Sequence, residues 1–322
     1  MNMKVLIPAP VMLVVVFAGA LPAADPQLLN LVMPDAEILA GVNVDQAKTS
    51  PFGMYVLAQF QAQDQHLREF TAQTGFDPTN DLHELLVAST GSQPHAPALT
   101  LARGAFSTDK INAAAQNAGA TSETYKGVKI FEDPKKGAGY AFLNGSLAVA
   151  GDVASVKAAI DRQTAPAPLP AALLVQVNQL SASEDAWAIS EVPPPNIELP
   201  SNGGNTPNLP TGIFQKIEQA SGGVKLGTQA IAVTAQLQAD TAVDAKQISD
   251  LLQFLANLGR MQTQNPQVPS LLNSLAVTTN GAVVGISLNV PEAEAETLFQ
   301  LKPKPKAAQQ DQPNGARPRR RR

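Results

Sequence analysis

Histidines next to carboxylates are the residues that would carry metal or acid–base chemistry, and one short run brings them together. His83-Glu84-Leu85-Leu86 begins like the helical zinc-protease motif, which needs a second histidine on the next helical turn to complete the metal face. Val87 occupies that position here, and the pattern around it predicts a strand instead of a helix. We therefore predict no metal site in this segment and no cofactor for the protein.

The chain also lacks the motifs of the common nucleophilic and nucleotide-binding enzymes. It contains no Gly-x-Ser-x-Gly elbow, no glycine-rich loop ending in Gly-Lys-Ser/Thr and no Gly-x-Gly-x-x-Gly. Asp35, Asp45, Asp152 and Asp185 stand at the ends of expected strands or helices, where capping is the ordinary role. We predict no catalytic residue, and an enzyme with catalytic residues dispersed in sequence stays the alternative.

The most unusual charged group is a run of arginines near the C-terminal end. Residues 302–322 carry eight Lys or Arg and one Asp, which gives +7, whereas the whole chain is 23 − 27 = −4. With +1 from Lys4, residues 21–301 therefore carry −4 − 7 − 1 = −12. We expect a disordered tail that binds an anionic surface or a polyanion such as nucleic acid, or that instead aids solubility or contacts the acidic body. The predicted binding residues are Arg317, Arg319, Arg320, Arg321 and Arg322.

The N-terminus resembles an export signal in composition. Lys4 is the only charged residue before Asp25, and the apolar run Val5–Phe17 is followed by the small-x-small sequence Ala18-Gly19-Ala20. We predict a signal peptide over residues 1–23, with an uncleaved anchor as the alternative, and a periplasmic or secreted protein with no transmembrane segment after cleavage. The absence of cysteine excludes disulfides and thiolate chemistry.

Two stretches share one order of elements. Residues 139–162 predict strand, tight turn, strand and helix, and residues 275–300 predict the same order. The turns are Asn144-Gly145 and Asn280-Gly281, which tolerate the positive φ of a two-residue hairpin loop. This recurrence indicates an internal duplication.

The expected organisation follows from that duplication. Prolines at alternate positions make 164–170 a linker between a first repeat, 24–163, and a second, 171–301. Strand pairs followed by helices predict an α+β fold: two tandem, degenerate repeats of antiparallel strands with helices packed on one face. Trp187 is expected in the core. Further expected elements are a single helix from Pro51 to Gly75, strands at 98–106 and 125–131, and a helix around 213–217 ended by Gly222-Gly223.

The opening Asp25-Pro-Gln-Leu-Leu and the run from Asp35 to Gly53 resemble uncharacterised secreted bacterial proteins, a family of unknown function. The resemblance implies export and no particular reaction. We therefore expect an exported, non-catalytic binding or envelope-associated protein whose ligand the sequence does not identify. A pocket lined by Ala, Leu and Phe would favour a carrier, and convergent Asp, Glu or His would favour an enzyme.

Overall fold

A computed structural model describes most of the chain between residues 24 and 300. The predicted signal, 1–23, and the predicted tail, 302–322 with its five arginines, lie outside the described residues. The described ranges are 24–63, 65–93, 95–193, 211–261 and 271–300.

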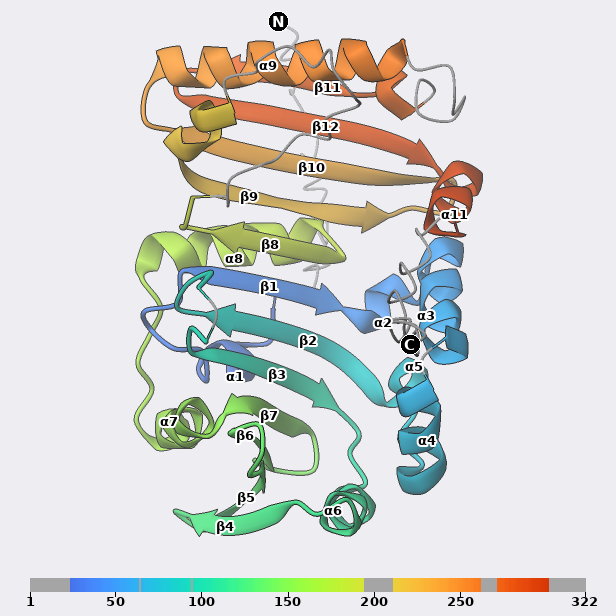
Figure 1. Cartoon of the computed structure of the whole chain (residues 1–322), viewed down its shortest axis with the longest axis vertical. Helices are drawn as coiled ribbons and strands as arrows, with labels where there is room; N and C mark the ends of the chain where they lie inside the picture. The colour runs from blue at the N-terminus through green and yellow to red at the C-terminus, as the bar shows by residue number, and fades with distance from the viewer. Residues whose placement is uncertain (1–23, 64, 94, 194–210, 262–270, 301–322) are drawn as a thin grey trace, which may run out of the picture.

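Within these ranges, twelve strands form one antiparallel sheet (Figure 1). Its order is β11-β12-β10-β9-β8-β1-β2-β3-β7-β6-β5-β4. The strands are β1 (Ile38–Asn43), β2 (Leu82–Ser89), β3 (Ala98–Gly104), β4 (Thr121–Tyr125), β5 (Val128–Asp133), β6 (Ala138–Phe142), β7 (Leu147–Asp152), β8 (Ala186–Ser190), β9 (Ile217–Leu226), β10 (Ala230–Ala239), β11 (Ala276–Asn280) and β12 (Val283–Pro291).

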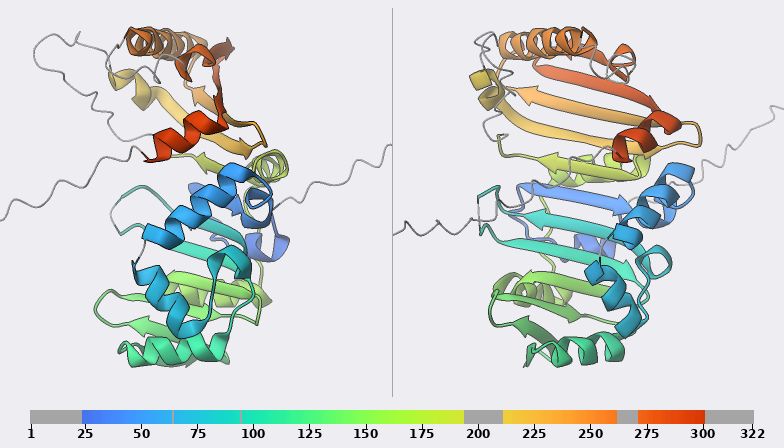
Figure 2. Two further views of the ribbon diagram at one scale, coloured as in Figure 1. Left: turned by 90° about the vertical axis from the view of Figure 1, so that its right-hand side faces the viewer. Right: turned by 45° about the vertical axis from the view of Figure 1, so that its right-hand side comes forward.

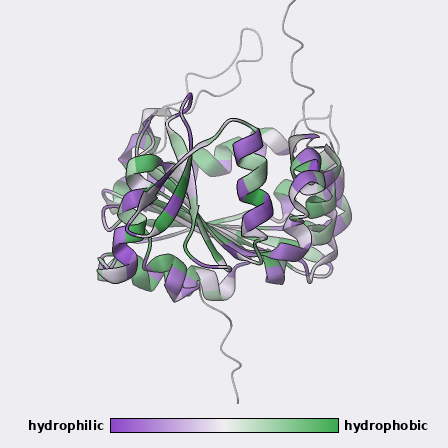
Figure 3. Cartoon of the chain, turned by 90° about the horizontal axis from the view of Figure 1, so that it is seen from below, coloured by the Kyte–Doolittle hydropathy of each residue, from purple (hydrophilic) through white to green (hydrophobic). Residues whose placement is uncertain are grey.

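Helices precede, connect and follow these strands. They are α1 (Pro26–Leu29), α2 (Val44–Ala47), α3 (Pro51–Gln63), α4 (Gln65–Thr74), α5 (Pro78–Asp81), α6 (Thr108–Asn117), α7 (Val153–Thr164), α8 (Ala171–Ser183), the 3₁₀ helix η1 (Thr211–Lys216), α9 (Ala242–Arg260) and α11 (Glu292–Gln300). Seen from below in Figure 3, hydrophilic and hydrophobic residues occur along the same helices, as expected for helices that cover a sheet.

The two halves of the chain meet in the middle of the sheet. β1 pairs with β8, with Leu39 opposite Ile189 and Gly41 opposite Trp187. Moving outward from this pair, the order is β1-β2-β3-β7-β6 on one side and β8-β9-β10-β12-β11 on the other. The proline-rich stretch 164–170 connects α7 to α8, which runs beside this junction (Figure 1).

The helices cover both faces of the sheet, which corrects the expectation of a single covered face. Ile189, which packs with α8, is opposite Ser221, and Ser221 is opposite Gln236, so these three residues share a face. Leu237 therefore points to the other face, where it packs against α9. In the left panel of Figure 2, the red α11 and the yellow-green α8 lie on opposite sides of the sheet. The apolar residues of β9 and β10 lie on the opposite face of the sheet from those of β1–β3. The helices that pack on these residues, α9 and α8, therefore lie on opposite faces too.

Several expected elements differ in the structure. The strand expected at 125–131 is a hairpin of β4 and β5, because Lys126 and Gly127 both have positive φ, 48° and 83°, as a two-residue primed turn requires. Gly222 and Gly223 lie inside β9 and do not end a helix. A Cβ at Gly223 would collide with the side chain of Glu184. The strand therefore needs glycine at the position where the Glu184 side chain packs on it.

The two Asn-Gly turns are not equivalent. Gly281 has a φ of 58° and begins a two-residue loop between Asn280 and Val283. Gly145 does not have a positive φ, so the primed turn predicted there is wrong. Asn144 closes that loop instead, because its side-chain oxygen accepts from the amides of Ser146 and Leu147, both at 2.8 Å.

The prediction that Trp187 belongs to the core is confirmed. Its side chain is 6% exposed, and the ring lies over Gly41 on the neighbouring strand, where a Cβ would stand 2.5 Å from the indole. The small residue on β1 and the large one on β8 therefore fit together at the junction of the two halves.

Candidate apolar binding site

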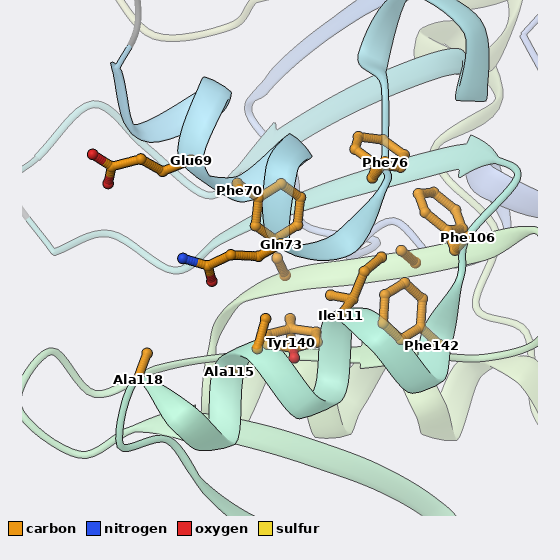
Figure 4. A pocket seen from close by; sticks show the side chains of 13 residues that line it. Glu69, Phe70, Gln73, Phe76, Phe106, Ile111, Ala115, Ala118, Tyr140 and Phe142 are labelled. Atoms are coloured by element: carbon orange, nitrogen blue, oxygen red, sulfur yellow. The ribbon is translucent and has the colours of Figure 1, made fainter.

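An apolar cavity lies between the sheet and two helices of the first half. It has a volume of about 480 Å³ and opens between α4 and α6, with β6 and β7 as its floor (Figure 4). Cavities of about 300–1,000 Å³ are the usual size for small-molecule sites. The lining residues are Glu69, Phe70, Gln73, Phe76, Phe106, Ile111, Ala114, Ala115, Ala118, Tyr140, Phe142, Ala148 and Ala150.

Aromatic rings form a continuous row along this cavity. Phe76 stacks on Phe106 with centroids 5.6 Å apart, and Phe106 contacts Phe142 at 5.3 Å. Phe70 extends the row at one end, and Tyr140 at the other. All five rings are only partly buried, so their faces and edges remain available to an apolar ligand.

The space exists because small side chains face the aromatic ones. On the floor, Tyr140 is opposite Ala150 and Phe142 is opposite Ala148 across the β6–β7 pair. The wall contributed by α6 is likewise made of alanines on the side of Ile111. A sheet and helix with larger residues at these positions would fill the volume with their own side chains.

Few polar atoms enter the cavity. The Tyr140 hydroxyl donates to Asn112 Oδ1 at 3.4 Å, and burial raises the pKa of Tyr140 to about 12. The phenol is therefore neutral at any physiological pH. Glu69 and Gln73 are exposed and lie at the α4 side of the opening, away from Phe142 (Figure 4). The site presents an apolar body with a neutral hydroxyl and a polar rim.

The His83 segment places its imidazole beside a single carboxylate, that of Asp45. His83 lies on β2, and its Nδ1 is 3.0 Å from a carboxylate oxygen of Asp45. Burial opposes ionisation of Asp45, but hydrogen bonds from His83 and Lys48 outweigh it and lower the pKa of that carboxyl. In the described part of the chain, no group of three or more His, Asp or Glu side chains is arranged to hold a metal ion.

The other candidate aspartates have structural partners or lie at the surface. Asp152 caps α7, as predicted, with its carboxylate 2.9 Å from the Ser155 amide. Asp185 is 1% exposed and accepts from the Lys225 ammonium at 2.6 Å and the Leu226 amide at 2.7 Å. Asp35 is exposed in the turn before β1.

A cluster formed by the side chains of Asp25, Glu84 and Arg103 was not predicted from the sequence. Glu84 is 7% exposed and accepts from the Asp25 amide at 3.0 Å, while the Asp25 carboxylate pairs with Arg103 at 2.9 Å. Burial raises the pKa of Glu84, against the Asp25 amide and the charge of Arg103. These contacts hold α1 against the sheet, so the cluster is explained by structure alone.

The cavity itself was also missed from the sequence, although its floor lies in the stretch 139–162 that was singled out. The available signal was alternation: aromatic residues on one face of β6 match alanines on the same face of β7. What could not be anticipated is that Phe70, Phe76 and Phe106, distant in sequence, would join that face.

Comparison with known proteins identifies a shared fold but no family and no activity. No family model matches the chain, and no curated protein matches it. Crystal form III of the Treponema protein TP0453 is similar, with a TM-score of 0.54 and 11% identity, over 84% of this chain and 96% of that one. Crystal form IV gives 0.51 and 11%, over 84% and 95%. At this identity the likeness shows a shared fold, a mixed α+β protein with a large antiparallel sheet.

No helix in the described ranges combines the length and apolarity needed to cross a bilayer.

Proposed function

We propose that this protein is a non-catalytic binding protein that holds a small, neutral, mostly apolar molecule in the cavity between α4 and α6. The observation that carries the proposal is the row of partly buried rings from Phe70 to Tyr140 facing a wall of alanines. Burying apolar ligand surface there would contribute about 25 cal/mol per Å².

The chemistry of the lining favours binding over catalysis. Glu69 is the only ionisable carboxylate among the described lining residues, and it is exposed at the rim. Tyr140 keeps its proton because its pKa is raised to about 12, so it serves as a hydrogen-bond partner and not as a base. An enzyme with dispersed catalytic residues gains no support from this cavity.

A fluorescence titration tests the proposal. The neutral dye N-phenyl-1-naphthylamine should bind and brighten, and Ala115→Leu, which fills the cavity from α6, should weaken binding about tenfold or more. Ala113→Leu is the matched control, because Ala113 is on the same helix but exposed and does not line the cavity. Equal weakening by both variants, or no binding by the wild type, would overturn the proposal.

We also propose export to the periplasm or beyond. The motivating pattern is Lys4, the apolar run and Ala18-Gly19-Ala20; in support, Ala24 and Asp25 are bound into the body through Ser181 and Glu84. Mass spectrometry of the native protein should find a new N-terminus between Leu21 and Asp25. An intact Met1 in the cytosolic fraction would contradict export.

The basic tail supports a second, separate binding proposal. Five arginines within residues 317–322 would bind a polyanion such as heparin weakly, with a slope of log affinity against log salt of about −3.5. Truncation after Leu301 should abolish this binding and leave the dye titration unchanged. Heparin binding that survives truncation would place the anionic site elsewhere.

We further propose that the two halves arose by duplication. The support is the matched outward strand order from the β1–β8 pair, with the second hairpins at β6–β7 and β11–β12 in corresponding positions. Superposition of 24–163 on 171–300 in an experimental structure should align these five strands. Failure to align them would remove the proposal.

A further inference from the structure

A second cavity lies on the sheet of the other half, on the face that carries α8. Its volume is about 320 Å³, and it is bordered by α8 and floored by β9, β10, β12 and β11. The register puts Ser221, Gln236, Gly285 and Thr278 in one row across these four strands. The same face is apolar and helix-covered around the β1–β8 pair, where Leu39 and Ile189 occupy it.

One wall holds an amide oxygen with no partner. Gln176 on α8 donates through Nε2 to Gln219 Oε1 at 2.8 Å, and Gln219 donates in turn to Glu191 at 3.3 Å. This relay fixes the Gln176 amide. Its Oε1 is shielded from solvent and has no hydrogen-bond partner in the described structure. A buried acceptor without a partner is costly, so the Gln176 amide leaves part of its hydrogen-bonding capacity unmet on this wall.

The floor presents a second oriented acceptor. The Thr234 hydroxyl donates to Oε1 of Glu184 at 3.2 Å, which leaves the Thr234 oxygen free to accept from a ligand. Glu184 is 9% exposed, and its other oxygen also has no partner among the described residues. It reaches this place because Gly223 leaves room for its side chain.

The remaining lining narrows the class of ligand. The lining consists of hydroxyls, amides and small or aliphatic residues, and no charged or aromatic side chain is among the described residues that form it. An anion would find no cation there, and a flat aromatic molecule would find no ring. The cavity lies on a sheet face and not at an edge, so a peptide could not add to the sheet as a further strand.

We propose that this second cavity is a binding site for a neutral saccharide. Sugar hydroxyls donate to the Thr234 oxygen, and they accept from the hydroxyls of Ser221, Thr278 and Ser287. Gly285 keeps the floor low enough for a sugar ring to approach, because a Cβ there would stand 2.8 Å from the Thr278 hydroxyl oxygen. The site is independent of the apolar cavity in the first half.

Saturation-transfer NMR with maltotriose and chitotriose at millimolar concentration tests this inference. The wild type should bind at least one of the two, and Thr278→Val and Gln176→Met should each weaken binding about fivefold or more. Thr279→Val is the matched control, because Thr279 is the next residue on β11, is exposed and points to the opposite face.

Each outcome decides the matter. Binding that is lost in both cavity variants and kept in Thr279→Val supports the saccharide site. Binding of neither trisaccharide, or binding that Thr278→Val and Gln176→Met leave unchanged, overturns it. The dye titration of the apolar cavity should be the same in all three variants, which shows that each is folded.

Discussion

Alanines shape the apolar cavity as much as the aromatic rings do. Ala148 and Ala150 leave the floor open beneath the rings, and Ala115 leaves the wall open. The rings alone would pack against one another and close the space. The residue-level reason for a binding site here is therefore the pairing of large with small side chains across β6 and β7.

The two Asn-Gly turns give opposite predictions for one substitution. Gly281→Val should destabilise the protein by about 1 kcal/mol or more, because a β-branched residue resists the φ of 58° at that position. Gly145→Val should change stability by less than about 0.5 kcal/mol, because Gly145 has ordinary φ and open space around its Cα. Urea denaturation of both variants measures this, and equal losses would show that the turns are alike.

Tyr140 should make stability fall at high pH. Burial raises its pKa from 10.0 to about 12, so the unfolded chain ionises first and the stabilisation is lost as pH rises from 10 through 12. Tyr140→Phe should reduce this fall, which denaturation at pH 9 and pH 11 would reveal. An unchanged pH dependence in Tyr140→Phe would mean that Tyr140 ionises as freely as in the unfolded chain.

At the scale of elements, helix starts differ in how strongly they are capped. Asp152 caps α7 and also accepts from the Ala98 amide at 3.3 Å, so it joins the helix to β3. Ser107 precedes α6 but makes no side-chain cap bond. Asp152→Ala should therefore cost about 1–2 kcal/mol of unfolding free energy and Ser107→Ala less than about 0.5 kcal/mol. Thermal denaturation compares the pair, and a larger loss in Ser107→Ala would contradict the assignment.

Elements with strong local signals were predictable from the sequence. Ser50 before Pro51 begins α3, with the Gly53 amide 2.9 Å from the serine oxygen, and Thr241 caps α9. The prediction of secondary structure failed at positions where contacts between distant segments determine the backbone conformation. Gly222-Gly223 has the composition of a helix stop, but those glycines lie in β9 because Glu184 packs on the strand. Lys126-Gly127 was missed because lysine rarely adopts positive φ.

Local sequence motifs argued against particular kinds of site in this protein, but they did not predict where a binding site lies. The missing second histidine is the reason we predict no zinc motif at His83, whose ring lies beside Asp45 in the structure. The apolar cavity draws on α4, β3, α6 and the β6–β7 hairpin, and no local pattern records that these segments meet. The arginines of the tail stay a prediction, since they lie outside the described residues.

At the scale of the whole molecule, one sheet makes the two halves depend on each other. β1 and β8 are central strands only because they pair with each other, and Trp187 of the second half packs on Gly41 of the first. Separation would expose both strand edges and the indole. The two halves should therefore unfold together.

Tryptophan fluorescence and far-ultraviolet circular dichroism test this cooperativity. Trp187 is the single tryptophan and sits at the junction, so its transition in urea should coincide with the loss of secondary structure. A Trp187 transition at lower urea than the loss of secondary structure would show that the halves separate before they unfold.

The cavity between α4 and α6 should bind neutral apolar molecules, and a homologous series of straight-chain alcohols measures this. Calorimetry with the wild type should show affinity rising about fourfold per added methylene, equivalent to about 0.8 kcal/mol, until the cavity is filled. Alkyl carboxylates of equal length should bind more weakly, because Glu69 is the charged group at the rim and no cation lines the cavity among the described residues. In Ala115→Leu the series should level off at a shorter chain. Affinity that does not rise with chain length, or that favours the carboxylates, would contradict the account.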